Sequence, residues 1–522
     1  MKLPEKIQNS GEKTAQAHLE NEFSTRPIDI LLRLVKNLFQ FWRAKIGVRR
    51  IMNNFPTIQE DLPIPEAEQI FSWIKAICRT PHRRPGTPEG LQAEQWVSEQ
   101  FSDIGLQNIT KDPIPIKVWK AQKWSLIVDN QKIPCFFCLN TGFTPPEGIT
   151  APLIYLGRGN SKDFRNVDVS GKIVVADVPF PFIPIGLLFR FLKLLRGVYH
   201  ISDPDGSLTL LKSQYLNFVR KNFIGGTTSE NAPRNDVYWN AYKGGAKGVC
   251  LILRDQPSNS NSHYGPYDGI MKPIPALWVG KYDGEVLRQK AKKHALAQVV
   301  LEGKIQEGVM HNIWGVLPGR TDEIVMVTSH HDSPFKGAIE DGAGIAQVLA
   351  QARIWSAIPR NKRKRTMVFV ADAGHFYGSE GAHTFARDHA DIMKKTRILI
   401  TLEHLGAKEV KEKDKKYVET HQQAYTVMFT SPEPLVIATV INALRKKPRK
   451  TTISMAMNLL GDAPTSDAAG YALESDVPLI SWIGCPYYLL DKYDTLDKVD
   501  TKELKPICET ITEFIKPYMA TK

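Results

Sequence analysis

The sequence predicts an α/β protein in which a mostly parallel sheet is sandwiched by helices and a β-rich domain is inserted. After residue 306, the apolar strands IVMVTSHHD, RTMVFVADAG and RILITLEHLG alternate with helical segments, one of them over residues 342–358. Strands covered on both faces read as continuous apolar runs, and their alternation with helices is typical of a parallel sheet. Between residues 131 and 305 short strands separated by Gly and Pro replace this pattern, which indicates an insert.

The elements are expected in the following order. An amphipathic helix is predicted over about residues 88–104, before the insert. The insert contributes the strand segments APLIYLG, DVSGKIVVADV, KGGAKGVCLILRD, PIPALWVG and ALAQVVLEG. The three apolar strands, the helices between them and a C-terminal helix then complete the α/β part.

Composition indicates a folded chain and excludes several classes. The chain has 522 residues, of which 42% are hydrophobic and 24% charged, so disordered and fibrous proteins are excluded and about two to four domains are expected. The net charge is +13, with basic runs at residues 360–365 and 445–450. These runs lie beside turns and have no interleaved aromatic residues, so we interpret them as solvated turns and expect no nucleic-acid partner. Six cysteines are too few for a disulfide scaffold.

Two cationic amphipathic segments stand out. The N-terminus has no apolar leader and the chain has no uncharged apolar run of 18 residues, so a cytoplasmic location is expected. Residues 28–46 and 185–196 instead combine apolar residues at helical spacing with Arg and Lys, a pattern that suits a membrane interface. The alternative is that both helices pack on the protein's own surface. An anionic membrane surface is therefore one expected partner.

Polar side chains follow the predicted strands at their carboxyl ends, where active groups of open α/β sheets gather. His330, Asp341 and Glu403 make a three-ligand zinc site that leaves a fourth position for water. A bound Zn²⁺ lowers the pKa of that water to about 7. Asp332 would orient the imidazole of His330, and His375 would carry protons between water and the leaving amine.

These motifs resemble those of the co-catalytic zinc aminopeptidases, whose fold is shared by glutamate carboxypeptidase, transferrin receptor and glutaminyl cyclase. The similarity extends from about residue 60 to the C-terminus. It rests on the segments RRPGTPEGLQAEQWVSEQFSDIGL, NIWGVLPG, VMVTSHHDS, GAIEDGAG, TSDAAGYALESDVPLI and DKYDTLDKVD. The insert resembles a protease-associated domain through DVSGKIVV and AYKGGAKGVCLIL. The resemblance implies a metallopeptidase that hydrolyses a peptide or amide bond.

The resemblance also divides the chain into four parts. Residues 1–58 are a polar tail with an amphipathic helical segment, and residues 59–130 are the first part of the aminopeptidase-like domain. Residues 131–305 are the protease-associated-like insert. Residues 306–522 are the second part of the aminopeptidase-like domain, and they carry the metal site.

Two positions depart from the family pattern. Where the family has a glutamate base followed by a glutamate ligand, this chain has His375 and Phe376. The family's histidine four residues before the Asp of the closing Asp-Thr pair corresponds to Leu490. Phe and Leu side chains cannot coordinate zinc, so the resemblance implies one ion rather than two. The loss of the second ion should weaken recognition of a free N-terminus.

Three interpretations follow for the function. In the first, a one-metal hydrolase uses His375 in place of the glutamate base. In the second, a reorganised site recruits His331, His375 or His404 as replacement ligands. In the third, the chain is a catalytically inactive peptidase homologue that acts as a binding protein, and a basic peripheral membrane adaptor is a further alternative. If residues 185–196 border the cleft, an apolar peptide or amide becomes the expected substrate.

Overall fold

The computed structural model describes residues 44, 46–58, 61–178, 183–184, 193, 198–204, 206, 212–213, 237–457, 463–464 and 466–520. Within these residues the chain forms two compact units. The smaller unit takes residues 119–178 and 237–304, and the larger unit takes the described residues of 44–118, 181–215 and 305–520. The insert boundaries at residues 131 and 305 stay a prediction.

The larger unit is built on one sheet. Its strands follow the order β11 (Leu296–Leu317), β13 (Arg365–Asp372), β12 (Thr321–His330), β14 (Thr396–Glu403), β19 (Leu479–Gly484), β17 (Thr426–Thr430), β18 (Thr452–Ala456) and β7 (Val198–Ser202). The pairs β13–β12, β12–β14, β14–β19 and β17–β18 are parallel, and the other three are antiparallel. The predicted fold class, a mostly parallel sheet with flanking helices, is confirmed.

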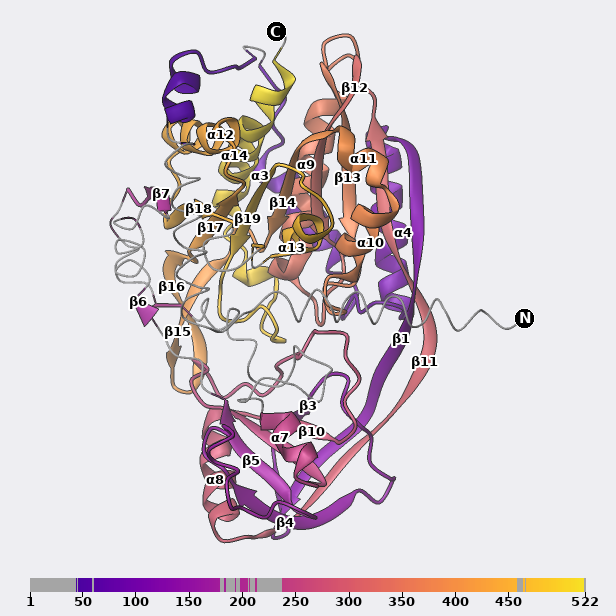
Figure 1. Cartoon of the computed structure of the whole chain (residues 1–522), viewed down its shortest axis with the longest axis vertical. Coiled ribbons are helices and arrows are strands. Elements are labelled where there is room, and N and C mark those ends of the chain that lie inside the picture. Colours follow the sequence, from indigo (N-terminus) through magenta and orange to yellow (C-terminus); the bar gives the residue numbers. More distant parts are fainter. Residues whose placement is uncertain are drawn as a thin grey trace, which may run out of the picture. The chain divides into compact units, whose positions relative to one another are not determined.

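Helices cover both faces of this sheet (Figure 1). They are α3 (Ala67–Ile77), α4 (Pro88–Ile104), α9 (Ala343–Ser356), α10 (Glu380–Asp388), α11 (Ala390–Lys395), α12 (Pro434–Lys446), α13 (Ala468–Glu474) and α14 (Thr501–Met519). Val325 and Val327 of β12 point into a core with α3, α4, α9, α12 and α14, whereas Ile324 and Met326 point into a second core with α10, α11 and α13. Successive residues of a strand face opposite sides, so burial on both faces explains the continuous apolar runs.

Parallel register brings the ends of the central strands to one edge of the sheet. His330, the last residue of β12, is in register with Asp372, the last residue of β13. β14 pairs with the other side of β12 and ends at Glu403. The loops that follow these strands therefore start next to one another, as the sequence predicts for an active-site edge.

The smaller unit is a separate α/β layer. Its strands are β3 (Cys135–Phe137), β10 (Ala276–Val279), β9 (Gly248–Leu253), β5 (Ile173–Val178) and β4 (Ile149–Tyr155), and β4 pairs with the first residues of β11. The four strands from β10 to β4 are parallel, and α7 (Val237–Lys243) and α8 (Lys281–Lys292) belong to the same unit. Strand β1 (Gln107–Val128) pairs with β2 (Gln131–Ile133) at its end.

Two further pairs of strands are short. One is the hairpin of β15 (Lys408–Lys413) and β16 (Lys416–Gln423), and the other is the antiparallel pair of β6 (Ile183–Pro184) and β8 (Lys212–Ser213). In the described part of the chain, no helix combines the length and the apolarity needed to span a bilayer. The two segments expected at a membrane surface, residues 28–46 and 185–196, lie almost entirely outside the described residues.

Candidate metal centre

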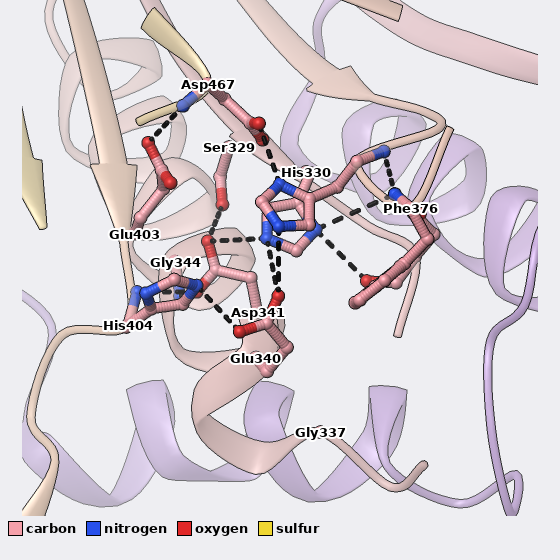
Figure 2. A network of polar contacts seen from close by, with 12 residues as sticks. Ser329, His330, Gly337, Glu340, Asp341, Gly344, Phe376, Glu403, His404 and Asp467 are labelled. Carbon is pink, nitrogen blue, oxygen red and sulfur yellow. Dashed lines mark hydrogen bonds and ion pairs between the residues drawn. The ribbon is translucent and has the colours of Figure 1, made fainter. Parts of the chain in front are cut away.

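Buried histidines and carboxylates converge beyond the ends of β12 and β14 (Figure 2). His330 ends β12, Glu403 ends β14, and Glu340 lies in the one-turn segment Ala338–Gly342 that leads into α9. Asp467 directly precedes α13. All four side chains belong to the larger unit and are at most 2% exposed, so water screens their charges little.

His330 and Glu340 face each other at the middle of the cluster. The Nε2 atom of His330 lies 3.4 Å from Oε1 of Glu340. Neither atom has a hydrogen-bond partner among the described residues. The other ring nitrogen of His330, Nδ1, lies 3.1 Å from the carbonyl oxygen of Asp332. A buried polar pair left this way is unusual in a folded protein and is expected where a ligand is missing.

His375 lies beside His330 and is held by a carboxylate. Its ring stacks on that of His330 with centroids 4.2 Å apart, and its Nε2 lies 3.6 Å from Oε1 of Glu340. Its Nδ1 lies 2.7 Å from Oδ1 of Asp467, which also accepts a hydrogen bond from the Ser379 hydroxyl at 2.6 Å. The orientation of His375 is thus fixed by a residue 92 positions away in the sequence.

His404 and Glu403 occupy the far side of the cluster. The Nε2 atom of His404 lies 2.9 Å from Oε2 of Glu340, and its Nδ1 lies 3.2 Å from the carbonyl oxygen of Gly484. Oε1 of Glu403 accepts a hydrogen bond from the amide of Asp467 at 2.9 Å. Oε2 of Glu403 and Oδ2 of Asp467 lack partners within the described part of the chain.

Asp341, the carboxylate predicted as a ligand, is committed to other groups. Its Oδ2 accepts from the Ser329 hydroxyl at 2.6 Å, and its Oδ1 accepts from the amides of Gly344 at 3.0 Å and His404 at 2.9 Å. It lies 3.9 Å from Nε2 of His330, farther than Glu340 does. The Asp341 carboxylate therefore links β12, α9 and the residue that follows β14 through hydrogen bonds, and Glu340 takes the position next to His330.

Two other predicted residues take supporting positions. The carboxylate of Asp332 accepts from the amides of His375 and Phe376 at 3.3 and 3.4 Å, so it ties the end of β12 to the loop after β13. Its Oδ1 lies 3.6 Å from Nδ1 of His330. His331, an alternative ligand, has its Nε2 3.0 Å from the carbonyl oxygen of His311 and does not join the cluster.

The turn that carries Glu340 is held by two residues from distant parts of the chain. The fully buried guanidinium of Arg83 donates to the carbonyl oxygens of His331, Lys336, Gly337 and Glu340. The carboxylate of Asp494 accepts from the amides of Ile339 and Glu340 at 2.9 and 2.8 Å. Gly337 has a φ of 57°, and a Cβ there would overlap Oγ of Ser333. This clamp fixes the direction of the Glu340 side chain.

The charges of the cluster are strongly coupled. Burial opposes the charged form of His404, but the Glu340 carboxylate raises the pKa of His404 to about 10. Burial likewise opposes ionisation of Glu340, and His404 outweighs it and lowers the pKa of Glu340 to about 2. Burial and His375 lower the pKa of His330, yet the nearby carboxylates Asp332, Asp467 and Asp341 raise it to about 9. The carboxylates thus make the centre favourable for positive charge.

The two remaining carboxyls behave in opposite ways. Burial first, and then the neighbouring Asp467, raise the pKa of Glu403 to about 8. Burial opposes ionisation of Asp467, but His375 and His330 hold the pKa of Asp467 well below its usual range. Two buried carboxyls side by side repel one another when both are ionised, and a bound cation would relieve that repulsion.

The donor atoms fit a divalent ion. Two groups have all their ligand atoms within 4.8 Å of one another: His330, Glu340 and His375, and His375, Glu403 and Asp467. In a tetrahedral zinc site with bonds of about 2.1 Å, neighbouring ligand atoms are about 3.4 Å apart. In the first group, Oε1 of Glu340 lies 3.4 Å from Nε2 of His330 and 3.6 Å from Nε2 of His375, and both distances agree with this value.

Sequence reasoning missed Glu340, Asp467 and Arg83. Glu340 is adjacent to Asp341 in GAIEDGAG, and the motif alone does not say which of the two acids faces His330. Asp467 lies in TSDAAG just before a short helix, where an acid is also an ordinary capping residue.

Comparisons with known proteins point to one peptidase family. The family model described as Peptidase family M28 matches residues 312–515. Aminopeptidase YwaD of Bacillus subtilis (strain 168) is 27% identical over 276 residues, which are 50% of this chain and 46% of the relative. Carboxypeptidase Q of Bos taurus is 25% identical over 134 residues, 25% of this chain and 28% of the relative. The chain thus matches less than half of the length of either curated relative.

Solved structures show the same fold. BSAP, a zinc aminopeptidase from Bacillus subtilis, superposes with a TM-score of 0.63 at 18% identity, covering 89% of this chain and 97% of that one. The peptidase M28 precursor from Shewanella amazonensis gives a TM-score of 0.62 at 18% identity, covering 93% and 98%. At 18% sequence identity, the similarity to these two structures shows a shared fold.

Proposed function

Residues 312–515 form a Peptidase family M28 domain, and from this premise we propose that the protein is a zinc-dependent hydrolase of peptide or amide bonds. One observation carries the proposal. Buried Nε2 of His330 and Oε1 of Glu340 lie 3.4 Å apart without hydrogen-bond partners in the described residues. A divalent ion between them would give each of these two atoms a binding partner. An ion bound there would activate a water molecule and polarise the scissile carbonyl.

The proposed centre holds one ion, with Glu340 in the role that the sequence suggested for Asp341. The imidazole of His404, 2.9 Å from Oε2 of Glu340, orients that carboxylate, and the carbonyl of Asp332 orients His330. Phe376 is fully buried beside His375 and provides no donor atom, which supports one ion rather than two. Glu403 and Asp467 lie on the other side of His375 and add negative charge to the same centre.

The substrate class we propose is a peptide or an amide. The relatives are named as an aminopeptidase and a carboxypeptidase, so cleavage next to a chain end is the first activity to assay. With Phe376 and Leu490 in place of ligands to a second ion, recognition of a free amino terminus is weaker, and N-blocked amides belong in the same assay. Apolar substrates, a cytoplasmic location and contact with an anionic membrane stay proposals from the sequence.

A second candidate is a binding protein without catalysis. It is supported by the two close charge pairs, His404 with Glu340 at 2.9 Å and His375 with Asp467 at 2.7 Å. Such pairs neutralise much of the buried charge without a metal. The two candidates differ in metal content, which makes them separable by one measurement.

The test is metal analysis of the purified protein together with amide hydrolysis. We expect about one equivalent of zinc, lost on His330→Ala and on Glu340→Gln. His383→Ala is the matched control, because Nδ1 of His383 also contacts a carboxylate, Glu474, at 3.0 Å, but outside the cluster. Protein that neither contains nor takes up zinc would overturn the hydrolase proposal and favour the binding protein.

A further inference from the structure

Three imidazoles surround the carboxylate of Glu340 and share one arrangement. In each ring Nδ1 lies near an oxygen atom on the outside: the carbonyl of Asp332 for His330, the carboxylate of Asp467 for His375, and the carbonyl of Gly484 for His404. In a neutral ring, an acceptor at Nδ1 keeps the hydrogen there, so Nε2 of His330 and of His375 can offer a lone pair. His404 differs, because its Nε2 faces the Glu340 carboxylate as an ion pair, which requires a hydrogen on that nitrogen. In each ring Nε2 is also the nitrogen near Glu340.

Distances separate the three rings into two kinds. His404 Nε2 lies 2.9 Å from Oε2 of Glu340, an ion-pair distance shorter than the edge of about 3.4 Å in a tetrahedral zinc site. The Nε2 atoms of His330 and His375 lie 3.4 and 3.6 Å from Oε1, too far for a good hydrogen bond and close to the edge of about 3.4 Å in a tetrahedral zinc site. His404 therefore contacts Glu340 directly, whereas the other two rings leave space for an ion.

We infer that Nε2 of His375 is a third ligand of the ion bound by His330 and Glu340. Asp467 is then the positioning residue that fixes the ring of His375. This inference rests on the proposed metal-dependent function. It assigns His375 to the metal rather than to proton transfer. With three protein ligands, the ion keeps a fourth position for water, as catalytic zinc sites do.

The position of Asp467 supports this assignment. Its Oδ1 accepts from Ser379 and contacts Nδ1 of His375, and its backbone amide donates to Glu403, so the residue is held through both its side chain and its main chain. The stacking of His375 on His330, with an interplanar angle of 13°, holds the two rings side by side. Both rings are therefore positioned before an ion arrives.

The test uses the full chain loaded with Cu²⁺ and measures the nitrogen hyperfine structure of its electron paramagnetic resonance spectrum, together with zinc affinity by competition with a chelator. We expect two imidazole nitrogens in the native protein and one in His375→Ala, with zinc affinity reduced at least about 100-fold. Asp467→Asn keeps an oxygen for Nδ1 but removes the charge, so a loss of about 10–100-fold in affinity is expected, with both nitrogens retained.

Two controls make the outcomes distinct. His383→Ala should leave both the spectrum and the affinity unchanged, and circular dichroism of His375→Ala and the milder His375→Gln checks that both variants fold. If the native protein binds metal and His375→Ala keeps both nitrogens and the native affinity, the inference is overturned, and His375 is a proton carrier in a hydrolase that still stands. If the native protein binds no metal, the proposed function itself fails.

Discussion

The clamp around Glu340 gives a prediction that can be worked out from the structure. Arg83 is fully buried and donates from its guanidinium to four carbonyl oxygens, three of them in the turn formed by residues 336–340. The amides of Ile339 and Glu340 in the same turn donate to Asp494. Replacing Arg83 by Met keeps much of the aliphatic volume but removes every donor. We expect the turn to open locally far more often.

The size of the effect follows from the number of carbonyls. A buried acceptor left without a donor costs about 1–3 kcal/mol. We take the low end for each of the four oxygens, because water can enter the vacated space, which gives about 4 kcal/mol. A factor of ten corresponds to about 1.4 kcal/mol, so the opening equilibrium shifts by roughly 1,000-fold.

Native-state hydrogen exchange measures this opening directly. We expect the amides of Ile339 and Glu340 to exchange roughly 1,000-fold faster in Arg83→Met and by an intermediate factor in Arg83→Lys. The neighbouring Arg84 is the matched control: it donates from Nε to the carbonyl of Pro334 at 3.0 Å, and Arg84→Met should change the same amides less than about tenfold. Equal exchange in the Arg83 and Arg84 variants would refute the clamp.

Three further predictions concern other parts of the larger unit. A Cβ on Gly344 would lie 2.3 Å from Oδ2 of Asp341, so Gly344→Ala should displace the Asp341 carboxylate, destabilise the unit by about 1–3 kcal/mol and weaken zinc binding. The control Ala350→Gly, in the same helix, should cost about 1 kcal/mol and leave the zinc affinity unchanged. Competition with a chelator measures the zinc affinity of both variants. Burial raises the pKa of Glu409 from 4.5 to about 8, so the folded state holds this proton more tightly than the unfolded state, and the resulting stabilisation is complete below about pH 4 and is lost as pH rises through 8. Relative to Glu409→Gln, the native protein should therefore lose about 3–4 kcal/mol in urea unfolding between pH 5 and 8, and parallel pH profiles for the two proteins would contradict this. Removing zinc with a chelator should lower the melting temperature, since an ion at about 100 times its dissociation constant adds about 2.7 kcal/mol, and His330→Ala should show no such shift.

The fold was predictable because its signals are local. Apolar runs such as IVMVTS and TMVFVA are buried on both faces, and helices between them cover the sheet, so the α/β class follows from the sequence. The positions of His330 and Glu403 at one edge of the sheet were also predictable, because parallel strands end at the same edge.

The other residues of the cluster were not predictable, because long-range contacts position them. Glu340 and Asp341 are neighbours with the same chemistry, and only Arg83 and Asp494, 257 and 154 positions from Glu340, fix which of them faces His330. The role of Asp467 depends in the same way on His375, which lies on another loop. Sequence spacing contains no information on such pairs.

The central claim is that one divalent ion lies between His330 and Glu340. Anomalous diffraction from crystals of the zinc-loaded protein, recorded on both sides of the zinc absorption edge, tests it most directly. We expect a single peak about 2.1 Å from Nε2 of His330 and within bonding distance of Oε1 of Glu340. Density without a peak there, with the imidazole of His330 hydrogen-bonded directly to the Glu340 carboxylate, would contradict the claim.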